Sequence, residues 1–139
     1  MKTKAFTTLF SLAFAAFFTL SCSIEQSPAP TVILTEVGEE DSQVAVKGEE
    51  MHLEAEINAP GIIQQIELVI IQQEGSGLNR YGFTASYTSG KYIGVKNAEF
   101  HEHIDIPEKA PNGKYDLVLT VIDMLEQTTT AHATIRIVD

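Results

Sequence analysis

Apolar and polar side chains alternate with a period of two residues through most of this chain. In the run M-H-L-E-A-E-I at 51–57, every odd-numbered residue is apolar and every even-numbered residue is a glutamate or a histidine. Successive side chains of a β-strand point to opposite faces, so this pattern predicts a strand with one face in a core and one in water. After residue 31, no stretch has the 3.6-residue apolar period of an amphipathic helix. The chain is therefore expected to be all-β.

Turn residues divide the alternating part into short segments. We expect strands at 32–37, 43–47, 51–57, 62–73, 99–106, 114–124 and 128–138, with one irregular strand and two loops in the glycine-rich stretch 74–94. A helix is the main alternative for 62–73, but its β-branched residues favour a strand. About seven strands at this spacing indicate an immunoglobulin-like β-sandwich over residues 32–139. Tyr115, just inside the penultimate strand, has the position of the tyrosine that braces a corner of such sandwiches.

The first 21 residues have the pattern of a secretory signal. Lys2 and Lys4 precede an uncharged, mostly apolar run from Ala5 to Leu20, and the small residue Ser21 follows. The apolar run is shorter than the roughly 20 residues that a stable membrane-spanning helix needs. We therefore expect residues 1–21 to be a cleaved signal peptide.

Cys22, the only cysteine, directly follows this leader. The stretch T-L-S-C at 19–22 resembles the lipobox of bacterial lipoproteins, although Leu20 lies one place later than the usual leucine. The resemblance implies that the Cys22 thiol carries a diacylglycerol and becomes the first residue of the mature protein; the alternative is an ordinary signal with an incidental cysteine. Residues 22–31, with Pro28 and Pro30, are then the lipidated cysteine and a flexible tether.

Composition limits what the mature domain can bind. Without residues 1–21 the chain keeps 118 of its 139 residues, with seven basic and 19 acidic side chains, a net charge of −12 with neutral histidines. Such a surface disfavours nucleic acid and suits cationic partners, metal ions or simple solubility. Only Glu25 follows Cys22 closely, so the acidic signal that sends some related lipoproteins to the cell surface is missing. We expect anchoring in the cell envelope, at the periplasmic face of the outer membrane.

Three segments carry a resemblance to a known family. They are G-E-E-M-H-L-E-A-E-I-N-A-P-G at 48–61, Y-I-G-V-K-N-A-E-F-H-E-H-I-D-I-P at 92–107 and A-P-N-G-K-Y-D-L-V-L-T-V-I-D at 110–123. They resemble a Bacteroidetes-type lipoprotein family with an immunoglobulin-like domain of unknown function, of which F-H-E-H-I-D-I-P is the most distinctive segment. The resemblance implies a lipidated, exported sandwich and supplies no activity.

The histidines are the sharpest functional signal. On one strand, His101 and His103 share a face and lie about 6.8 Å apart. Pairing of the second and fifth strands of an immunoglobulin-like sheet would place His52 beside them. Three imidazoles with the Glu54 carboxylate would suit Zn²⁺, Cu²⁺ or Ni²⁺. Glu102 should face inward, which makes Glu54 the better fourth ligand, and His132 belongs to the last strand and the other sheet.

Two other interpretations stay open. Exposed histidines on a strand can simply cover a sheet and bond to neighbouring carboxylates. Alternatively, Tyr81, Phe83, Tyr87 and Tyr92 in the glycine-rich stretch could form an aromatic surface for an envelope protein or a glycan, if they are exposed together.

Catalytic motifs are missing from the sequence. It has no G-x-S-x-G, H-E-x-x-H or phosphate-binding loop, and Asp123 has no companion acidic residues in a calcium-loop pattern. We therefore expect a lipid-anchored binding protein and not an enzyme.

Overall fold

The computed structural model describes residues 27–74 and 79–139, which form eight strands and one short 3₁₀ turn. The strands are β1 (Thr31–Val37), β2 (Val44–Val46), β3 (Glu50–Asn58), β4 (Ile63–Gln72), β5 (Gly82–Tyr87), β6 (Asn97–Asp105), β7 (Gly113–Asp123) and β8 (Thr128–Val138). The turn η1 (Glu39–Asp41) follows β1. The all-β prediction is confirmed, and the irregular strand expected within 74–94 is β5. Within the described ranges, no helix is long and apolar enough to cross a membrane. The predicted signal peptide and Cys22 lie outside the described residues.

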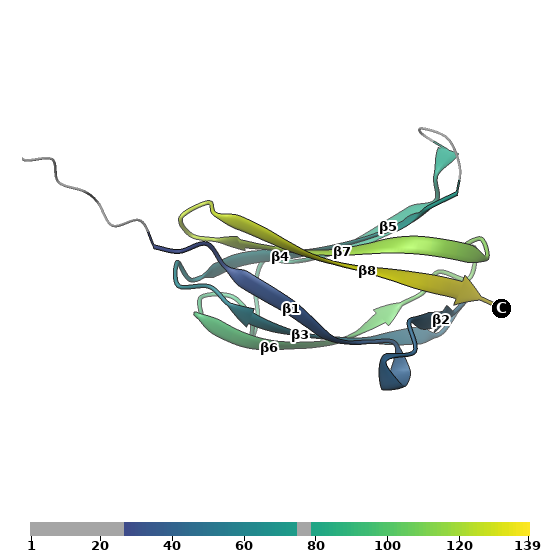
Figure 1. Cartoon of the computed structure of the whole chain (residues 1–139), viewed down its shortest axis with the longest axis horizontal. Coiled ribbons are helices and arrows are strands. Elements are labelled where there is room, and N and C mark those ends of the chain that lie inside the picture. The colour runs from purple at the N-terminus through teal and green to yellow at the C-terminus, as the bar shows by residue number, and fades with distance from the viewer. Residues whose placement is uncertain (1–26, 75–78) are drawn as a thin grey trace, which may run out of the picture.

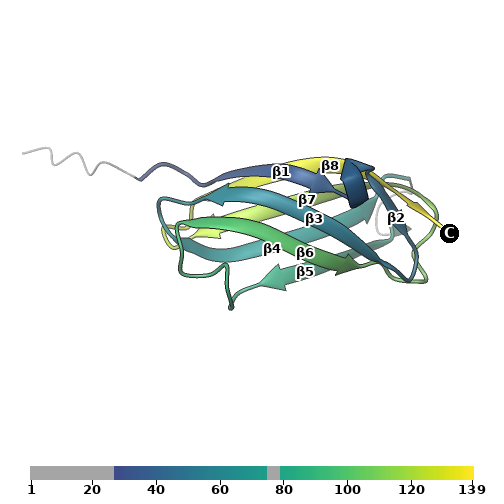
Figure 2. The ribbon, with the colours of Figure 1, turned by 90° about the horizontal axis from the view of Figure 1, so that it is seen from below.

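Two sheets pack face to face. One has three strands in the order β1-β3-β6, and the other has five in the order β2-β8-β7-β4-β5. Figure 1 shows the sheets as two layers, with the chain entering at one end of the sandwich and the C-terminus at the other. In the view from below, β6 lies across the strands of the other sheet (Figure 2). This arrangement is the immunoglobulin-like sandwich that the strand spacing predicted.

The core lies between the sheets and follows the alternation of the sequence. On β3 the odd-numbered side chains are buried, and on β7 every second residue from Tyr115 to Asp123 is buried. The largest side chains with almost no exposure include Tyr115, Phe100, Leu53, Ile66, Leu117 and Ile135. Since one face of each sheet is used for this core, the other face of the three-stranded sheet is free to carry polar side chains.

Tyr115 braces a corner of the sandwich. Its ring is fully buried, and its hydroxyl donates a 2.7 Å hydrogen bond to the carbonyl oxygen of Pro111, four residues upstream. This is the tyrosine corner that the position of Tyr115 predicted.

Asp123 is the only buried charged or polar residue of the described core. Its Oδ1 accepts hydrogen bonds from the backbone N–H groups of Leu125 (2.9 Å) and Gln127 (2.8 Å), which fixes the turn between β7 and β8. Its Oδ2 lies against Gly61 in the β3–β4 turn, so close that a Cβ on residue 61 would lie 2.2 Å from it. Asp123 therefore ties two turns together, and the contact requires glycine at position 61.

Candidate metal site

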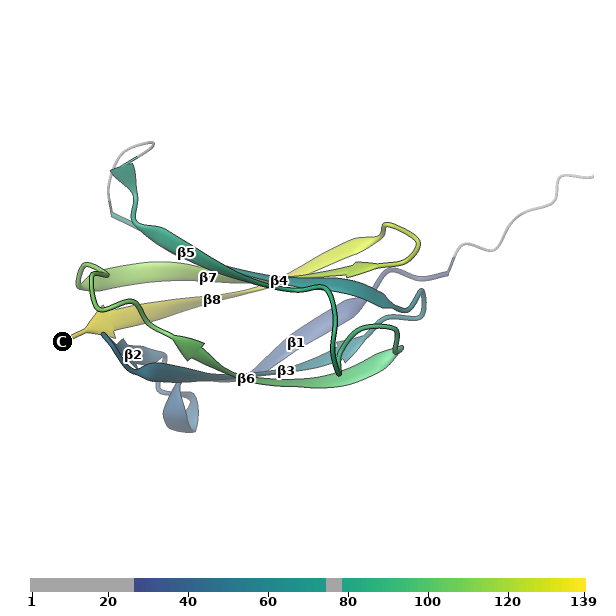
Figure 3. The same ribbon diagram turned by 180° about the vertical axis from the view of Figure 1, so that it is seen from behind.

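Antiparallel pairing of β3 with β6 brings the three predicted histidines together. In the register of these strands, His52 is opposite His103 and Glu54 is opposite His101. All four side chains belong to the outer face of the three-stranded sheet, because their neighbours in sequence are the ones that point into the core. The predicted pairing of the strands is confirmed. Figure 3 shows β3 and β6 side by side at the face away from the other sheet.

The imidazole rings form a compact triangle. Ring centroids are 4.5 Å apart for His52 and His101, 5.3 Å for His52 and His103, and 5.7 Å for His101 and His103. One ring nitrogen from each histidine can be chosen so that all three lie within 4.8 Å of one another. The His52 side chain is 22% exposed, whereas those of His101 and His103 are 52% and 56% exposed. The cluster therefore has one recessed imidazole and two at the surface.

Glu54 lies between two of the rings. Its Oε1 is 2.8 Å from Nδ1 of His101 and 3.3 Å from Nε2 of His52. Two donors bonded to one tetrahedral Zn²⁺ at about 2.0–2.1 Å are about 3.3 Å apart. The 3.3 Å contact matches that spacing and the 2.8 Å contact is shorter, so Glu54 lies beside the rings where the sequence predicted a fourth ligand.

Glu36 joins the cluster, and sequence analysis missed it. Its Oε1 is 3.3 Å from Nδ1 of His52, and Glu36, His52 and Glu54 form a second group of convergent donors. Strict alternation from Ile33 would turn Glu36 toward the core. However, the register of β1 against β3 shifts between Leu34 and Glu36, which places Glu36 opposite Glu54 on the outer face. A β-bulge of this kind has no reliable sequence signal here.

Carboxylates lie beside both ring nitrogens of His52. Nδ1 is 3.3 Å from Glu36 Oε1, and Nε2 is 3.3 Å from Glu54 Oε1. Nε2 is buried and has no hydrogen-bond partner among the described residues. A buried polar atom without a partner is costly, and a metal ion bound at Nε2 would satisfy it.

The backbone of His101 is held from the side by Tyr92, at the free edge of β6. The Tyr92 hydroxyl accepts a hydrogen bond from the His101 N–H (3.0 Å) and lies 2.8 Å from the His101 carbonyl oxygen and 2.6 Å from Glu102 Oε1. Burial, followed by the hydrogen bond with Glu102, raises the pKa of Tyr92 above its ordinary value of 10.0. Glu102 also forms an ion pair with Lys91, at 3.3 Å. The Glu102 side chain therefore lies on the side of β6 opposite the histidines, as predicted.

His132 lies apart from the site. It belongs to β8 in the five-stranded sheet, and its Nε2 is 3.1 Å from the Thr130 hydroxyl. The expected separation of His132 from the other histidines is confirmed, which makes it a useful control.

The tyrosines of the glycine-rich stretch do not form the exposed aromatic surface considered above. Tyr92 is only 4% exposed, and Tyr81, Phe83 and Tyr87 are half-buried and pack against the core. Tyr87 and Tyr92 both contact Phe100, with ring centroids 5.2 Å and 5.0 Å away. The aromatic surface is absent because Tyr92, after β5, is buried against Phe100, while Tyr81, Phe83 and Tyr87, in and next to β5, pack against the core.

The fold and the site together define a small immunoglobulin-like sandwich with a histidine and carboxylate cluster on one outer face. The chain belongs to the family described as Domain of unknown function (DUF4625), whose model matches residues 20–138. No curated protein matches the chain.

Solved structures of OgpA share the fold at low sequence identity. The chain is similar to wild-type OgpA from Akkermansia muciniphila, with 18% identity, a TM-score of 0.52, and coverage of 80% of this chain and 30% of OgpA. The same values hold for catalytically inactive OgpA solved with an O-glycopeptide substrate. Spo0M, a sporulation control protein from Bacillus subtilis, is 15% identical, with a TM-score of 0.49 and coverage of 81% and 51%. The chain thus spans less than a third of OgpA, and the likeness to OgpA shows the fold alone.

Proposed function

We propose that this protein is an exported, lipid-anchored binding protein of the bacterial cell envelope that holds a divalent transition-metal ion. His52, His101, His103 and Glu54 are the ligands, and Glu36 orients His52. In this proposal the protein acts by binding and not by catalysis.

The convergence of three imidazoles around one recessed nitrogen carries the proposal. Histidines that merely cover a sheet would be satisfied by water and by neighbouring carboxylates. Here Nε2 of His52 is buried without a hydrogen-bond partner among the described residues, while two further imidazoles and a carboxylate surround it. Nitrogen donors with one carboxylate suit Zn²⁺, Cu²⁺ and Ni²⁺.

The donor set also favours divalent ions over Cu⁺, because it contains no sulfur. Met51, next to His52 in sequence, is 2% exposed and points into the core. Soft thioether and thiolate ligands are the ones that select Cu⁺.

The cellular location follows from the leader and the cysteine. The proposal places the Cys22 lipid in the outer membrane, with the domain on its periplasmic side. A doubly or triply acylated cysteine, at about 0.8 kcal/mol per buried methylene, would keep the domain at the bilayer.

Calorimetric titration of the metal-stripped, full-length mature protein in detergent tests the metal site. We expect one Zn²⁺, Cu²⁺ or Ni²⁺ per chain with a dissociation constant below about 10 μM, and a loss of at least about 100-fold in affinity in the double variant His101→Ala/His103→Ala. His132→Ala is the matched control and should bind as the unchanged protein does. Absence of binding for all three ions, or equal binding by the double variant, would refute the proposal.

A further inference from the structure

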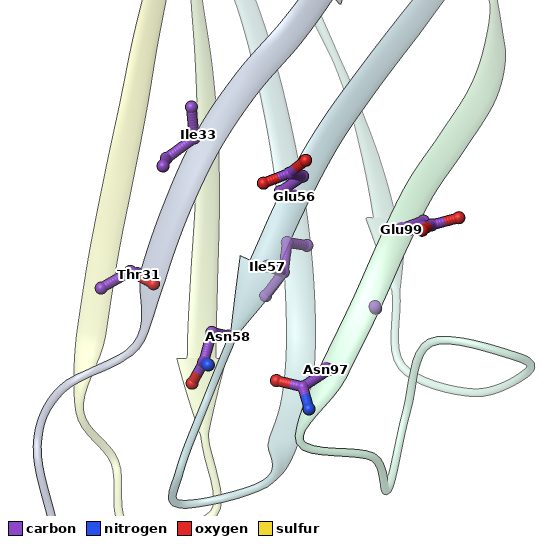
Figure 4. A pocket seen from close by; sticks show the side chains of 8 residues that line it. Thr31, Ile33, Glu56, Ile57, Asn58, Asn97 and Glu99 are labelled. Carbon is purple, nitrogen blue, oxygen red and sulfur yellow. The ribbon is translucent and has the colours of Figure 1, made fainter.

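A shallow hollow lies on the same outer face, at the end of the sandwich where β1 begins. Its lining includes Thr31 and Ile33 from β1, Glu56 and Asn58 from β3, and Asn97 and Glu99 from β6. Figure 4 shows these side chains on three neighbouring strands. Its volume of about 560 Å³ is enough to admit a long side chain of a partner.

Two like charges oppose each other in this hollow. Glu56 and Glu99 are direct cross-strand partners on β3 and β6, and both are exposed. Neither carboxylate has an ion-pair or hydrogen-bond partner among residues 27–74 and 79–139. Like charges placed directly opposite each other destabilise a sheet, so this pair costs stability in the protein by itself.

The sheet supplies no cation to offset this cost. β1, β3 and β6 contain no lysine or arginine at all, and their outer face carries six carboxylates, from Glu36, Glu50, Glu54, Glu56, Glu99 and Asp105. Glu36, Glu50 and Glu54 each lie near a histidine. Glu56 and Glu99 line a neighbouring hollow with Glu54 and His101, but neither forms an ion pair with a histidine of the described residues.

An apolar contact is available beside the two carboxylates. Ile33, opposite Glu56 on β1, is 60% exposed and is the most exposed large hydrophobic side chain of the described residues. An arginine side chain has a matching composition, since its aliphatic stem covers apolar surface while its charged head stays with polar groups. The hollow contains no aromatic ring among the residues that line it, so it lacks the stacking surface that would favour a sugar.

We propose that this hollow binds an arginine side chain presented by a basic, extended segment of a protein partner. The guanidinium would lie between the carboxylates of Glu56 and Glu99, with its stem on Ile33, and the side-chain oxygens of Asn58 and Asn97, which line the same hollow, would accept its remaining N–H groups. The proposal uses no ligand of the metal site and does not depend on a bound metal.

NMR titration of the full-length mature protein in detergent, with EDTA present, tests the proposal. The probe is the peptide acetyl-Gly-Arg-Gly-Arg-Gly-amide. A peptide with citrulline in place of arginine has nearly the same shape without the charge and is the matched control. We expect shifts of the backbone amide signals centred on Ile33, Glu56 and Glu99 with the arginine peptide, and none with the citrulline peptide.

Two double variants separate the hollow from general acidity. Glu56→Gln/Glu99→Gln should weaken binding of the arginine peptide at least about tenfold, because it removes both charged partners. Glu50→Gln/Asp105→Asn removes the like-charged pair at the other end of the same two strands, outside this hollow, and should change binding less than about twofold. Equal binding of the citrulline peptide, shifts centred elsewhere, or equal effects of the two double variants would overturn the proposal.

Discussion

His52 and His103 face each other directly across β3 and β6, with ring centroids 5.3 Å apart and ring planes inclined by only 23°. His101 lies two residues from His103 on the same face of β6, and its ring is 4.5 Å from that of His52. One ring nitrogen of each histidine therefore lies within reach of a single ion. A metal ion coordinates neutral imidazole, and these rings would supply three such nitrogens to it.

Replacing Glu36 tests its role behind His52. Glu36→Gln keeps the shape of the side chain but removes the charge that lies 3.3 Å from Nδ1 of His52. We expect zinc affinity, measured by calorimetry, to fall about tenfold, which is the scale typical of groups that orient a metal ligand. The same variant should leave the free energy of unfolding of the metal-free protein within about 0.5 kcal/mol. A loss as large as that caused by removing His101 and His103 together would mean that Glu36 is itself a ligand.

Alkaline pH should destabilise the protein through its buried tyrosines. Burial raises the pKa of Tyr115, and burial with Glu102 raises the pKa values of Tyr87 and Tyr92 above the ordinary value of 10.0. Because these pKa values are raised in the folded state, their contribution to stability is fully present below about pH 9 and is lost as the pH rises past the folded pKa values. Urea unfolding at about pH 8, 10 and 11 should show this decline. In the Tyr92→Phe variant, the free energy of unfolding should fall less steeply with rising pH. An unchanged pH dependence would show that Tyr92 does not contribute to this loss of stability.

A methyl group at position 61 should strain the contact with Asp123. Gly61→Ala would place Cβ 2.2 Å from Asp123 Oδ2, and Asp123 cannot move without loss of its hydrogen bonds to Leu125 and Gln127. We expect a loss of about 2–4 kcal/mol in the free energy of unfolding, measured with urea. In a double-mutant cycle, the cost of Gly61→Ala should be smaller when residue 123 is already alanine. Additive costs would indicate that the two residues do not interact.

Lipid attachment is tested at Cys22. In a bacterial host that processes lipoproteins, the unchanged chain should separate with the membrane fraction and carry the mass of a diacylglycerol on residue 22. Cys22→Ser should abolish that mass and release the domain, or leave it with an uncleaved leader. A chain cleaved at another residue and free of lipid would contradict the proposed anchor.

Alternation of side chains predicted the larger part of the fold and of the site. The pattern of 51–57 and the H-x-H pair of β6 were enough to assign faces, because a strand leaves only two choices for each side chain. The strand pairing then followed from the order of strands in immunoglobulin-like sheets. Glu36 was missed because a bulge in β1 breaks the alternation, and Tyr92 was placed wrongly because its loop is buried by tertiary contacts with Phe100 and Glu102. Neither effect depends on the residues adjacent in sequence.

The bulge in β1 also determines which kinds of sequence change the cluster would tolerate. It absorbs one residue between Leu34 and Glu36, so Glu36 reaches His52 while Leu34 and Val37 both stay on the inner side. Deleting Thr35 would remove only the extra residue, so Leu34, Glu36 and Val37 would alternate as in a regular strand and Glu36 would stay opposite Glu54. The carboxylate beside His52 therefore does not depend on the bulge being kept, and descendants of this gene could lose Thr35 through a single three-base deletion and retain the whole cluster.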